Sequence, residues 1–287
     1  MQTISSITAM QAFARRARAE GKTIALVPTM GFFHQGHVSL MQEGRRRGDY
    51  LVISIFVNPT QFGVGEDFEA YPRDMERDQK LAQEAGVDVI FAPEAAKMYP
   101  SGYQTYVNVE GVTQNLCGIS RPTHFRGVTT VVCKLFCIVQ PDCAIFGEKD
   151  FQQLVAIRQM ASDLNFDLEI VGMPIYREED GLAMSSRNRY LTPDERKAAL
   201  CIINSLKGAQ ALFDAGEREG KKIAGEVKNG IEAEPLSRID YIKICDASDL
   251  QDIDQITQRA VLAVAVNVGK ARLIDNVLLD PLAAKES

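Results

Sequence analysis

Two of the three histidines in this chain of 287 residues lie three positions apart, at His34 and His37. Because an imidazole titrates near neutral pH, it can donate a hydrogen bond or a proton to charge that develops on a phosphate. Paired histidines also occur simply as surface residues, and zinc is a further candidate ligand. Zinc ligands, however, usually lie four positions apart on a helix or beside cysteines at finger spacing, and neither pattern surrounds this pair. The spacing therefore favours anion binding.

The residues around the histidine pair predict a strand, a turn and a helix. An apolar run at 24–27, ended by Pro28, is typical of a buried parallel strand. Gly31 lets the backbone of the turn approach a ligand closely, and a helical pattern follows at 38–48. At such a junction of a doubly wound α/β sheet, free N–H groups and the helix dipole attract anions. We therefore expect a phosphate-binding turn here.

Three further turns carry polar side chains next to apolar segments. Two follow strand-like runs at 50–57 and 142–146, and the third precedes an apolar helix predicted at 128–139. Amides suit a small polar substrate and cations suit a phosphate. The side chains in question are Asn58, Gln61, Arg121, His124, Lys149 and Gln153. Taken alone, ordinary turn chemistry explains the Asn58 turn better than binding does, and the Arg121 turn equally well. Neither a P-loop nor a G-x-G-x-x-G dinucleotide motif occurs.

A polar segment at 177–191 contains Ser185, Ser186 and Arg187. A mobile loop with two hydroxyls and an arginine can close over a triphosphate. The same composition suits a linker between domains, and a linker beside an active site can serve both purposes. Thr192 then caps a helix that has Pro193 at its first position.

The order of the predicted elements indicates an α/β fold, a Rossmann-like doubly wound parallel sheet with a smaller C-terminal α+β domain. The first part of the chain adds helices and strands at 5–18, 73–85, 87–91, 105–109 and 168–173. After Thr192 two helices precede three strand-like runs without alternation, at 193–214, 217–233, 239–245, 261–268 and 271–278. We predict one domain at 1–176 and a second at 177–287.

Composition and charge exclude several classes of protein. With 46% hydrophobic residues, the chain can bury a sizeable core. A net charge of −6 and a pI near 5.3 argue against a broad basic surface for nucleic acid. No run of about 18 uncharged apolar residues predicts a membrane span, and the first residues lack the features of a secretory signal. The six cysteines, none in C-x-x-C spacing, are expected as reduced, mostly buried thiols of a cytoplasmic protein.

Together, these side chains suit a reaction that depends on charge stabilisation and positioning more than on a covalent protein nucleophile. Attack of a carboxylate on a nucleotide phosphate is one such reaction. No Ser-His-Asp pattern and no activated cysteine stands out.

Five segments carry a resemblance to known proteins. Residues 28–37 contain His34-Gln35-Gly36-His37, which is similar to the H-x-G-H signature of the nucleotidylyltransferase superfamily and alone identifies only that superfamily. The other segments are Asn58-Pro59-Thr60-Gln61-Phe62, Arg121-Pro122-Thr123-His124-Phe125, Phe146-Gly147-Glu148-Lys149-Asp150 through Gln153, and Met184-Ser185-Ser186-Arg187-Asn188. Jointly they resemble the pantoate–β-alanine ligase family, the pantothenate synthetases, in order across residues 1–190 and more weakly to about 279.

The resemblance implies an enzyme of the carbon–nitrogen ligase class. Such an enzyme condenses (R)-pantoate with β-alanine to pantothenate, a coenzyme A precursor, and converts ATP to AMP and pyrophosphate. Pantoate first forms a pantoyl adenylate, from which the β-alanine amine displaces AMP. The resemblance also implies a homodimer with small-molecule substrates and no membrane or nucleic-acid partner. Mg²⁺ is expected with ATP, held mainly by the phosphates and not by a protein metal site.

The resemblance also assigns roles to individual residues. The expected catalytic residues are His37, His34 and Lys149, with His37 the proton donor. The expected ATP-binding residues are Met30, Gly31, His34, His37, Gly147, Glu148, Lys149, Asp150, Tyr176, Met184, Ser185, Ser186 and Arg187. The expected pantoate and β-alanine residues are Gln61, Gln153, Asn58, Arg121 and His124. Domain 1–176 would bind ATP and pantoate, and domain 177–287 would act as a lid.

Two other functions remain in competition at this stage. A different nucleotidylyltransferase, acting on a phosphorylated metabolite, would share the histidine turn. It should lack the amides of Asn58, Gln61 and Gln153 and should need more basic residues for a second phosphate. A nucleotide sensor on the same fold would have little use for both histidines together with Lys149. Pantoate-dependent release of pyrophosphate distinguishes the ligase from both.

Overall fold

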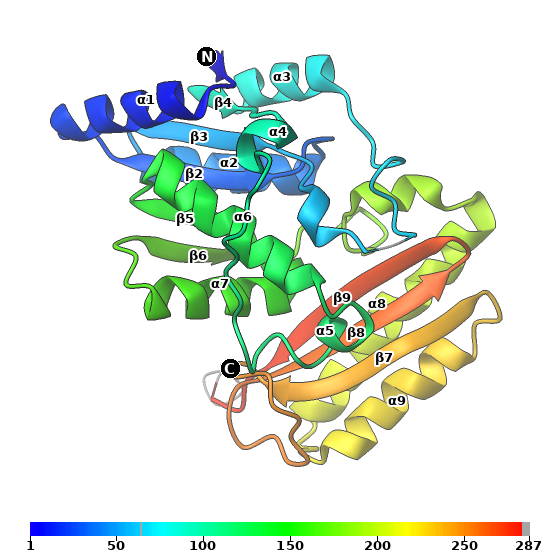
Figure 1. Cartoon of the computed structure of the whole chain (residues 1–287). Helices are drawn as coiled ribbons and strands as arrows, with labels where there is room; N and C mark the ends of the chain where they lie inside the picture. The colour runs from blue at the N-terminus through cyan, green and yellow to red at the C-terminus, as the bar shows by residue number, and fades with distance from the viewer. Residues whose placement is uncertain (64, 283–287) are drawn as a thin grey trace. The chain divides into compact units, whose positions relative to one another are not determined.

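A six-stranded parallel sheet, in the order β1-β4-β3-β2-β5-β6, forms the centre of the N-terminal unit (Figure 1). The computed structural model describes residues 1–63 and 65–282. The N-terminal unit comprises Met1–Thr113, Cys117–Glu148 and Gln153–Pro174. Its strands are β1 (Gln2–Ile4), β2 (Ile24–Thr29), β3 (Tyr50–Ile55), β4 (Val89–Phe91), β5 (Cys143–Gly147) and β6 (Glu169–Met173). The strands β2 and β5, which are neighbours in the sheet, mark the point where the strand order reverses, and ligands of such sheets bind there.

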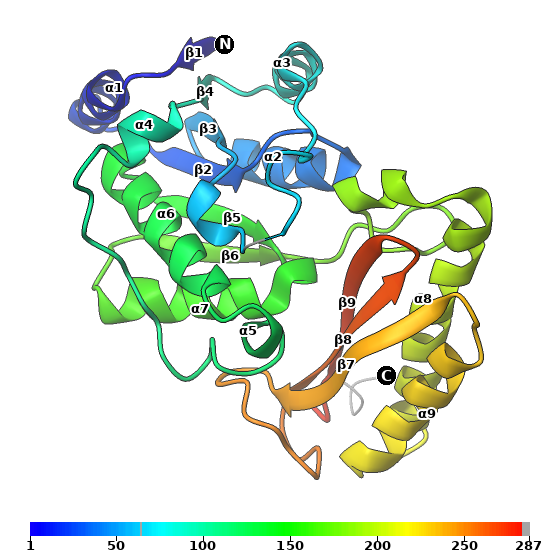
Figure 2. The same ribbon diagram turned by 45° about the vertical axis from the view of Figure 1, so that its right-hand side comes forward.

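Helices cover both faces of this sheet, as expected for a doubly wound fold (Figures 1 and 2). On one face lie α1 (Ile7–Ala19), α6 (His124–Val139) and α7 (Phe151–Asp163). On the other lie α2 (Gln35–Arg47) and α3 (Met75–Glu84). Shorter elements complete the unit: η1 (Pro59–Gln61), α4 (Ala95–Met98) and α5 (Cys117–Ser120). The short helix η2 (Glu148–Asp150) begins in this unit at Glu148, and its other two residues belong to the C-terminal unit. The apolar runs that predicted the strands are buried, for example Ile24 to Val27, because a parallel sheet is covered on both faces.

The predicted strand at 105–109 is wrong. No strand is assigned there, because hydroxyl groups of α6 take the backbone hydrogen bonds of Val107. The Val107 N–H donates to Thr130 Oγ1 at 2.9 Å, and Thr129 Oγ1 donates to the Val107 carbonyl at 2.8 Å. Strand β1, which has three residues and pairs with β4, was not predicted. Helices α2 and α6 begin three and four residues earlier than expected, so His37 and His124 lie inside their first turns.

The C-terminal unit comprises Gln114–Leu116, Lys149–Gln152 and the chain from Ile175 onward. Its antiparallel sheet has the order β7-β8-β9, from β7 (Ser237–Asp246), β8 (Ala260–Val268) and β9 (Ala271–Leu279). Helices α8 (Pro193–Asp214) and α9 (Gly220–Glu232) pack against this sheet around one apolar core (Figure 2). The predicted fold class, a doubly wound parallel sheet followed by a smaller α+β part, is confirmed.

The start of α8 agrees with the predicted cap. The Glu195 N–H donates to Thr192 Oγ1 at 3.3 Å, and the Thr192 N–H donates to Glu195 Oε2 at 2.8 Å. These reciprocal bonds form a capping box, with Pro193 at the first helical position. The loop before it contains η3 (Ser186–Tyr190).

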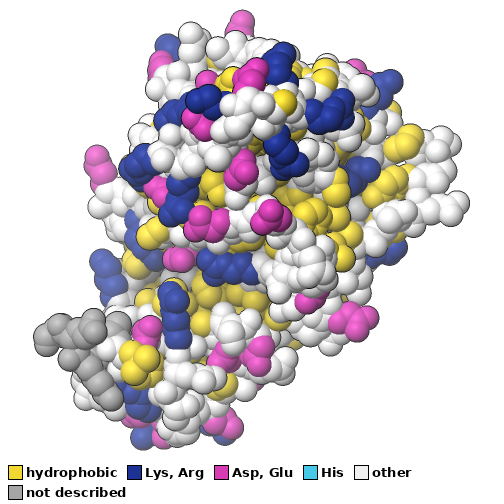
Figure 3. All heavy atoms as spheres, turned by 90° about the vertical axis from the view of Figure 1, so that its left-hand side faces the viewer, with side chains coloured by type: hydrophobic (Ala, Val, Ile, Leu, Met, Phe, Trp, Pro, Cys, Tyr) yellow, Lys and Arg dark blue, Asp and Glu magenta, His cyan; other side chains and the backbone are white. Residues whose placement is uncertain are grey.

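Charged side chains of both signs are interspersed on the face shown in Figure 3. Apolar side chains are visible between them over much of the same face. Within the part of the chain that the structure describes, no helix is long and apolar enough to cross a membrane.

Candidate active site

The histidine turn begins where β2 ends, at the reversal point of the sheet. Gly31 adopts a positive φ of 82°, which suits glycine, and Phe32 follows with a φ of 52°. A Cβ at Gly31 would lie 2.9 Å from Asp78 Oδ2, so the turn passes close to α3. The strand, the strained turn and the start of α2 together bring the two histidines to the carboxyl edge of the sheet.

Asp78 holds the turn in this conformation. Its carboxylate accepts the Phe32 N–H at 2.6 Å and the Phe33 N–H at 2.7 Å, from a side chain that is 1% exposed. Burial raises the pKa of Asp78, although the two backbone bonds act to lower it. Asp78 was not predicted from the sequence. It lies 45 positions from Phe33, and α3 contains several other charged residues from which no pattern distinguishes it.

His34 and His37 lie against each other, with ring centroids 4.0 Å apart. The His34 N–H donates to His37 Nδ1 at 3.4 Å. In a neutral imidazole the second nitrogen then carries the proton, so Nε2 of His37 is a hydrogen-bond donor. A donor beside the N-terminus of α2 is suited to a phosphate oxygen.

Gln61 is the centre of a second group of side chains, at the end of β3. Its backbone carbonyl accepts hydrogen bonds from Arg121 Nη2 at 3.2 Å and from His124 Nδ1 at 2.9 Å. Its amide nitrogen contacts Met30 Sδ at 3.2 Å, and its amide oxygen accepts from Asn58 Nδ2 at 3.1 Å. The structure therefore brings Asn58, Arg121 and His124 to Gln61, where each forms a hydrogen bond that fixes it.

An ion pair supports this second group. Arg121 Nε donates to Glu66 Oε1 at 2.6 Å, and Arg121 Nη2 contacts Glu66 Oε2. Burial acts to raise the pKa of Glu66, but the hydrogen bond and the positive charge of Arg121 outweigh it and leave that pKa lowered. Glu66 is a further residue that was not predicted from the sequence, because acidic loops are usually solvated.

The end of β5 supplies the remaining expected residues of the N-terminal unit. Gly147 is its last residue, Glu148 begins η2, and Gln153 lies in the first turn of α7. A Cβ at Gly147 would meet no other atom within 4 Å among the described residues. This glycine therefore leaves room for a ligand near the backbone, and the fold does not need it for packing.

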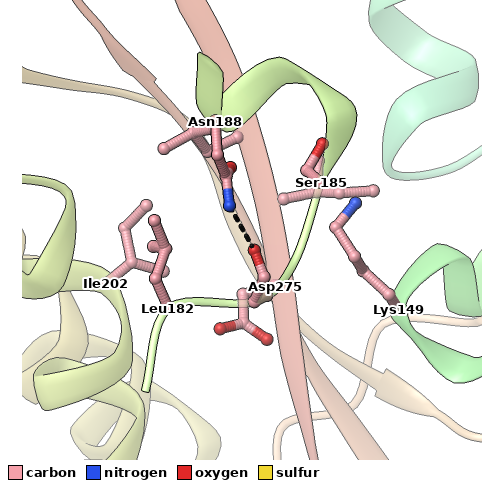
Figure 4. Close-up of a pocket in the computed structure, with 9 residues that line it drawn as sticks. Lys149, Leu182, Ser185, Asn188, Ile202 and Asp275 are labelled. Carbon is pink, nitrogen blue, oxygen red and sulfur yellow. Dashed lines mark hydrogen bonds between the residues drawn. The ribbon is translucent and has the colours of Figure 1, made fainter. Parts of the chain in front are cut away.

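Lys149 and Ser185 belong to the C-terminal unit, where they line one small cavity (Figure 4). Lys149 extends its ammonium group toward the segment that carries Ser185. The cavity has a volume of about 10 Å³, and that is space for about one water molecule and not for a nucleotide. The backbone of Lys149 is held by Asn276 Nδ2, which donates to the Lys149 carbonyl at 3.1 Å. Asp150 lies 4.0 Å from the Lys149 ammonium.

The loop with the expected ATP-binding serines is anchored at both of its ends. Arg177 forms a two-pronged ion pair with Asp275, at 2.7 and 3.0 Å, and Asp275 is 3% exposed. Asn188 Nδ2 donates to Ala183 O at 3.1 Å, the bond drawn in Figure 4. Within the loop, Ser185 Oγ accepts the Arg187 N–H at 3.2 Å.

The other expected residues of this loop follow the same path. The Met184 N–H donates to the Tyr176 carbonyl at 3.0 Å, and the Tyr176 side chain is 42% exposed. Ser186 and Arg187 lie in η3. Thus the expected site residues fall into two groups. The histidine turn, Gln61 and Gly147 lie on the N-terminal unit, and Lys149 with the serine loop lies on the C-terminal unit.

The fold and the polar turns at the carboxyl ends of its strands define a doubly wound α/β protein. A model of the pantoate–β-alanine ligase family matches residues 2–278. A relative named pantothenate synthetase from Syntrophus aciditrophicus is 59% identical over 276 residues, covering 96% of each chain. Another from Geobacter sulfurreducens is 59% identical over 279 residues, covering 97% of this chain and 99% of the relative.

Solved structures give the same result. The pantothenate synthetase of Thermus thermophilus superposes with a TM-score of 0.93 at 44% identity, covering 98% of this chain and all of the other. A pantoate–β-alanine ligase from Francisella tularensis, described as complexed with β-γ ATP and β-alanine, gives a TM-score of 0.79 at 31% identity over 97% of each chain. The present chain belongs to the pantoate–β-alanine ligase family.

Proposed function

We propose that this protein condenses (R)-pantoate with β-alanine to form pantothenate, with ATP converted to AMP and pyrophosphate. The observation that carries the proposal is the family match over residues 2–278, which includes all five motif segments. A different nucleotidylyltransferase or a sensor is not favoured, because the relatives with full-length matches are named pantothenate synthetase.

The reaction has two steps. A carboxylate oxygen of pantoate attacks the α-phosphorus of ATP, the bond from that phosphorus to the bridging oxygen breaks, and pyrophosphate leaves. The amine of β-alanine then attacks the carbonyl carbon of the adenylate. The bond from this carbon to the phosphate oxygen breaks, AMP leaves with one of the original pantoate oxygens, and the nitrogen loses its extra proton. Both steps need stabilised negative charge and aligned reactants, and neither needs a nucleophile from the protein.

We assign charge stabilisation in the first step to the histidine turn. The Nε2–H of His37 donates to a phosphate oxygen and is the candidate proton donor, while His34 binds phosphate beside it. Met30 and Gly31 border the nucleotide. The two rings lie 4.0 Å apart at one end of one helix, which supports a shared ligand.

The amides of Gln61 and Gln153 hold pantoate, and Gln61 also orders β-alanine. The amide nitrogen of Gln61 is its donor end, because Asn58 donates to its oxygen. A donor suits the carboxylate and hydroxyl oxygens of pantoate. Asn58, Arg121 and His124 contribute by fixing Gln61.

Residues of β5 and of the C-terminal unit complete the ATP site in this proposal. Lys149 acts on the phosphates as a point charge, and Arg187 offers a planar fork of donors. Gly147, Glu148 and Asp150 bind near the nucleotide, together with the 184–187 segment and the backbone of Tyr176. The division into domains 1–176 and 177–287, with the second as a lid, is part of the proposal, as are a homodimer and a cytoplasmic location.

Mg²⁺ is expected to enter with ATP. Among the described residues no group of three or more His, Cys, Asp or Glu side chains is arranged to hold a metal. In this proposal the ATP phosphates hold the Mg²⁺, which would neutralise charge on the departing pyrophosphate.

Pyrophosphate release tests the function directly. With ATP and pantoate but no β-alanine, we expect a burst of about one pyrophosphate per active site, followed by steady turnover when β-alanine is added. D-lactate, which has the 2-hydroxy acid group without the branched carbon chain, serves as a control substrate. Release that does not depend on pantoate would contradict the proposal and return the chain to the broader nucleotidylyltransferase class.

A further inference from the structure

The buried amide of Asn58 is fully engaged in hydrogen bonds. Its side chain is 1% exposed, and its Nδ2 donates to Gln61 Oε1 and to the Gly127 carbonyl, both at 3.1 Å. Its Oδ1 accepts from the Tyr99 hydroxyl at 2.8 Å and from Thr60 Oγ1 at 2.9 Å. Both amide protons and both lone pairs of the oxygen are thus used.

This pattern determines the orientation of Asn58. With its amide reversed, the NH₂ group would face the Thr60 N–H, which is a donor, and the oxygen would face two acceptors, Gln61 Oε1 and the Gly127 carbonyl. A buried amide in that orientation would lose its hydrogen bonds to Gln61 and to the Gly127 carbonyl. The Thr60 N–H and the Gly127 carbonyl select the orientation in which Asn58 donates to Gln61, and the Tyr99 hydroxyl adds a hydrogen bond of 2.8 Å that holds Asn58 in that orientation.

The orientation of Asn58 in turn sets that of Gln61. Because Gln61 Oε1 accepts from Asn58, its NH₂ group is the end left to face Met30 Sδ, at 3.2 Å, and a ligand. The Gln61 main chain is held separately by Arg121 and His124. The remaining freedom of Gln61 is rotation of its side-chain amide, and the bond from Asn58 restricts that rotation.

Tyr99 can influence the side-chain amide of Gln61 through Asn58, without contacting Gln61 itself. It follows α4 as its C-cap residue, and its ring packs edge-on against Tyr103 at 5.1 Å and lies 6.3 Å from Phe56. Burial raises the pKa of Tyr99 to about 12, so the phenol remains protonated at physiological pH and stays a donor. Tyr99 was not predicted from the sequence, because it lies outside the five motif segments.

We propose that Tyr99 is a positioning residue for pantoate, which acts through Asn58 to hold the Gln61 amide with its NH₂ group toward the substrate. The inference rests on the proposed function, since it assumes that Gln61 binds pantoate. It adds a residue outside the five motif segments, on a different element, that controls substrate affinity without touching the substrate.

Tyr99→Phe tests the inference, because phenylalanine keeps the packed ring and removes only the hydroxyl. We expect the KM for pantoate to rise about tenfold, as for the loss of a buried hydrogen bond, while the KM for ATP changes less than about twofold. Tyr103→Phe is the matched control: it removes the hydroxyl of the neighbouring ring, for which no hydrogen bond is found among the described residues. It should leave both KM values unchanged.

A double-mutant cycle separates positioning from general destabilisation. In a Gln61→Ala background the amide is gone, so adding Tyr99→Phe should change the KM for pantoate no further. An equal rise in both backgrounds, or parallel rises of both KM values, would overturn the inference. If the wild-type protein shows no pantoate-dependent pyrophosphate release, the proposed function fails instead.

A spectroscopic measurement keeps the test independent of activity. The side-chain amide signal of Gln61 in a ¹H–¹⁵N spectrum is identified by its disappearance in Gln61→Glu. In Tyr99→Phe we expect this signal to shift or broaden, and in Tyr103→Phe to stay in place. An unchanged signal in Tyr99→Phe would contradict coupling between the hydroxyl and the amide even if the catalytic assay failed.

Discussion

Gly127 permits α6 to approach the turn that carries Gln61, and we predict that Gly127→Ala damages both packing and pantoate binding. A Cβ there would lie 2.3 Å from the Thr60 carbonyl oxygen, 2.5 Å from its carbon and 2.6 Å from the Gln61 nitrogen. Ordinary contact begins near 3.4 Å, so the turn would have to move by about 1 Å. All three atoms are backbone, and no side-chain rotation can relieve the contact.

The size of the effect follows from two opposing contributions. Overpacking of this kind costs about 1–3 kcal/mol, whereas alanine improves helix propensity by up to about 1 kcal/mol. The matched control is Gly225→Ala in α9, where a Cβ would meet no described atom within 4 Å and propensity alone should act. We expect the free energy of unfolding to differ by about 1–3 kcal/mol between the two variants.

Gly127→Ala should impair catalysis as well as stability. The displaced atoms belong to Thr60 and Gln61, and a misplacement of 1 Å can lower a rate about 100-fold. We therefore expect kcat/KM for pantoate to fall at least about tenfold in Gly127→Ala and to stay at the wild-type value in Gly225→Ala. Urea unfolding and steady-state pyrophosphate release measure the two quantities. The reasoning is refuted if the two variants behave alike in both assays.

Four contacts elsewhere give further predictions. Asp78→Asn replaces one acceptor at the Phe32 and Phe33 N–H groups by a donor, so the rate of adenylate formation should fall about tenfold or more. Burst kinetics like those of the wild type would contradict the role of Asp78 in holding the turn. Arg177→Ala leaves Asp275 buried and unpaired, and it should lower the free energy of unfolding in urea by about 3–5 kcal/mol. The control Lys221→Ala removes one partner of an exposed ion pair and should leave the free energy of unfolding nearly unchanged. Equal losses in the two variants would refute this prediction. Lys149→Ala should abolish the pyrophosphate burst, whereas Lys228→Ala, which breaks an exposed ion pair, should leave the burst intact. The circular dichroism spectrum should be unchanged in both variants. A normal burst in Lys149→Ala would show that Lys149 has no part in the mechanism. The folded-state pKa of Glu66 is lowered, so its contribution to stability is present above the unfolded pKa near 4.3 and is lost as pH falls through the folded value. The difference in unfolding free energy between wild type and Glu66→Gln should therefore shrink between about pH 5 and pH 3. A difference that grows over this range would contradict the lowered pKa.

Periodicity and capping predicted most of the fold. Buried parallel strands are continuous apolar runs, so β2, β3 and β5 were predicted to within a few residues. Thr192, Pro193 and Glu195 marked the start of α8 because a capping box is a local feature of the sequence. The short strand β1 was missed because three residues, two of them exposed, give no pattern.

Residues that act from a distance were beyond prediction. Asp78 and Tyr99 each reach the candidate site from separate elements, and their importance lies in hydrogen bonds with partners 45 and 41 positions away. The error at 105–109 has the same origin, since the hydroxyls that replace strand pairing come from α6. Gly127 was not singled out from the sequence, because only the packed backbone shows what its missing Cβ allows.

Oxygen transfer tests the central claim, an acyl adenylate, most directly. Pantoate labelled with ¹⁸O in its carboxylate is turned over with ATP and β-alanine, and the AMP and pyrophosphate are analysed by mass spectrometry. We predict one ¹⁸O atom in AMP for each pantothenate formed and none in pyrophosphate, because the attacking oxygen leaves with AMP. Pantothenate formed with unlabelled AMP would contradict an acyl adenylate, since the carboxylate would then have been activated elsewhere than at the α-phosphorus.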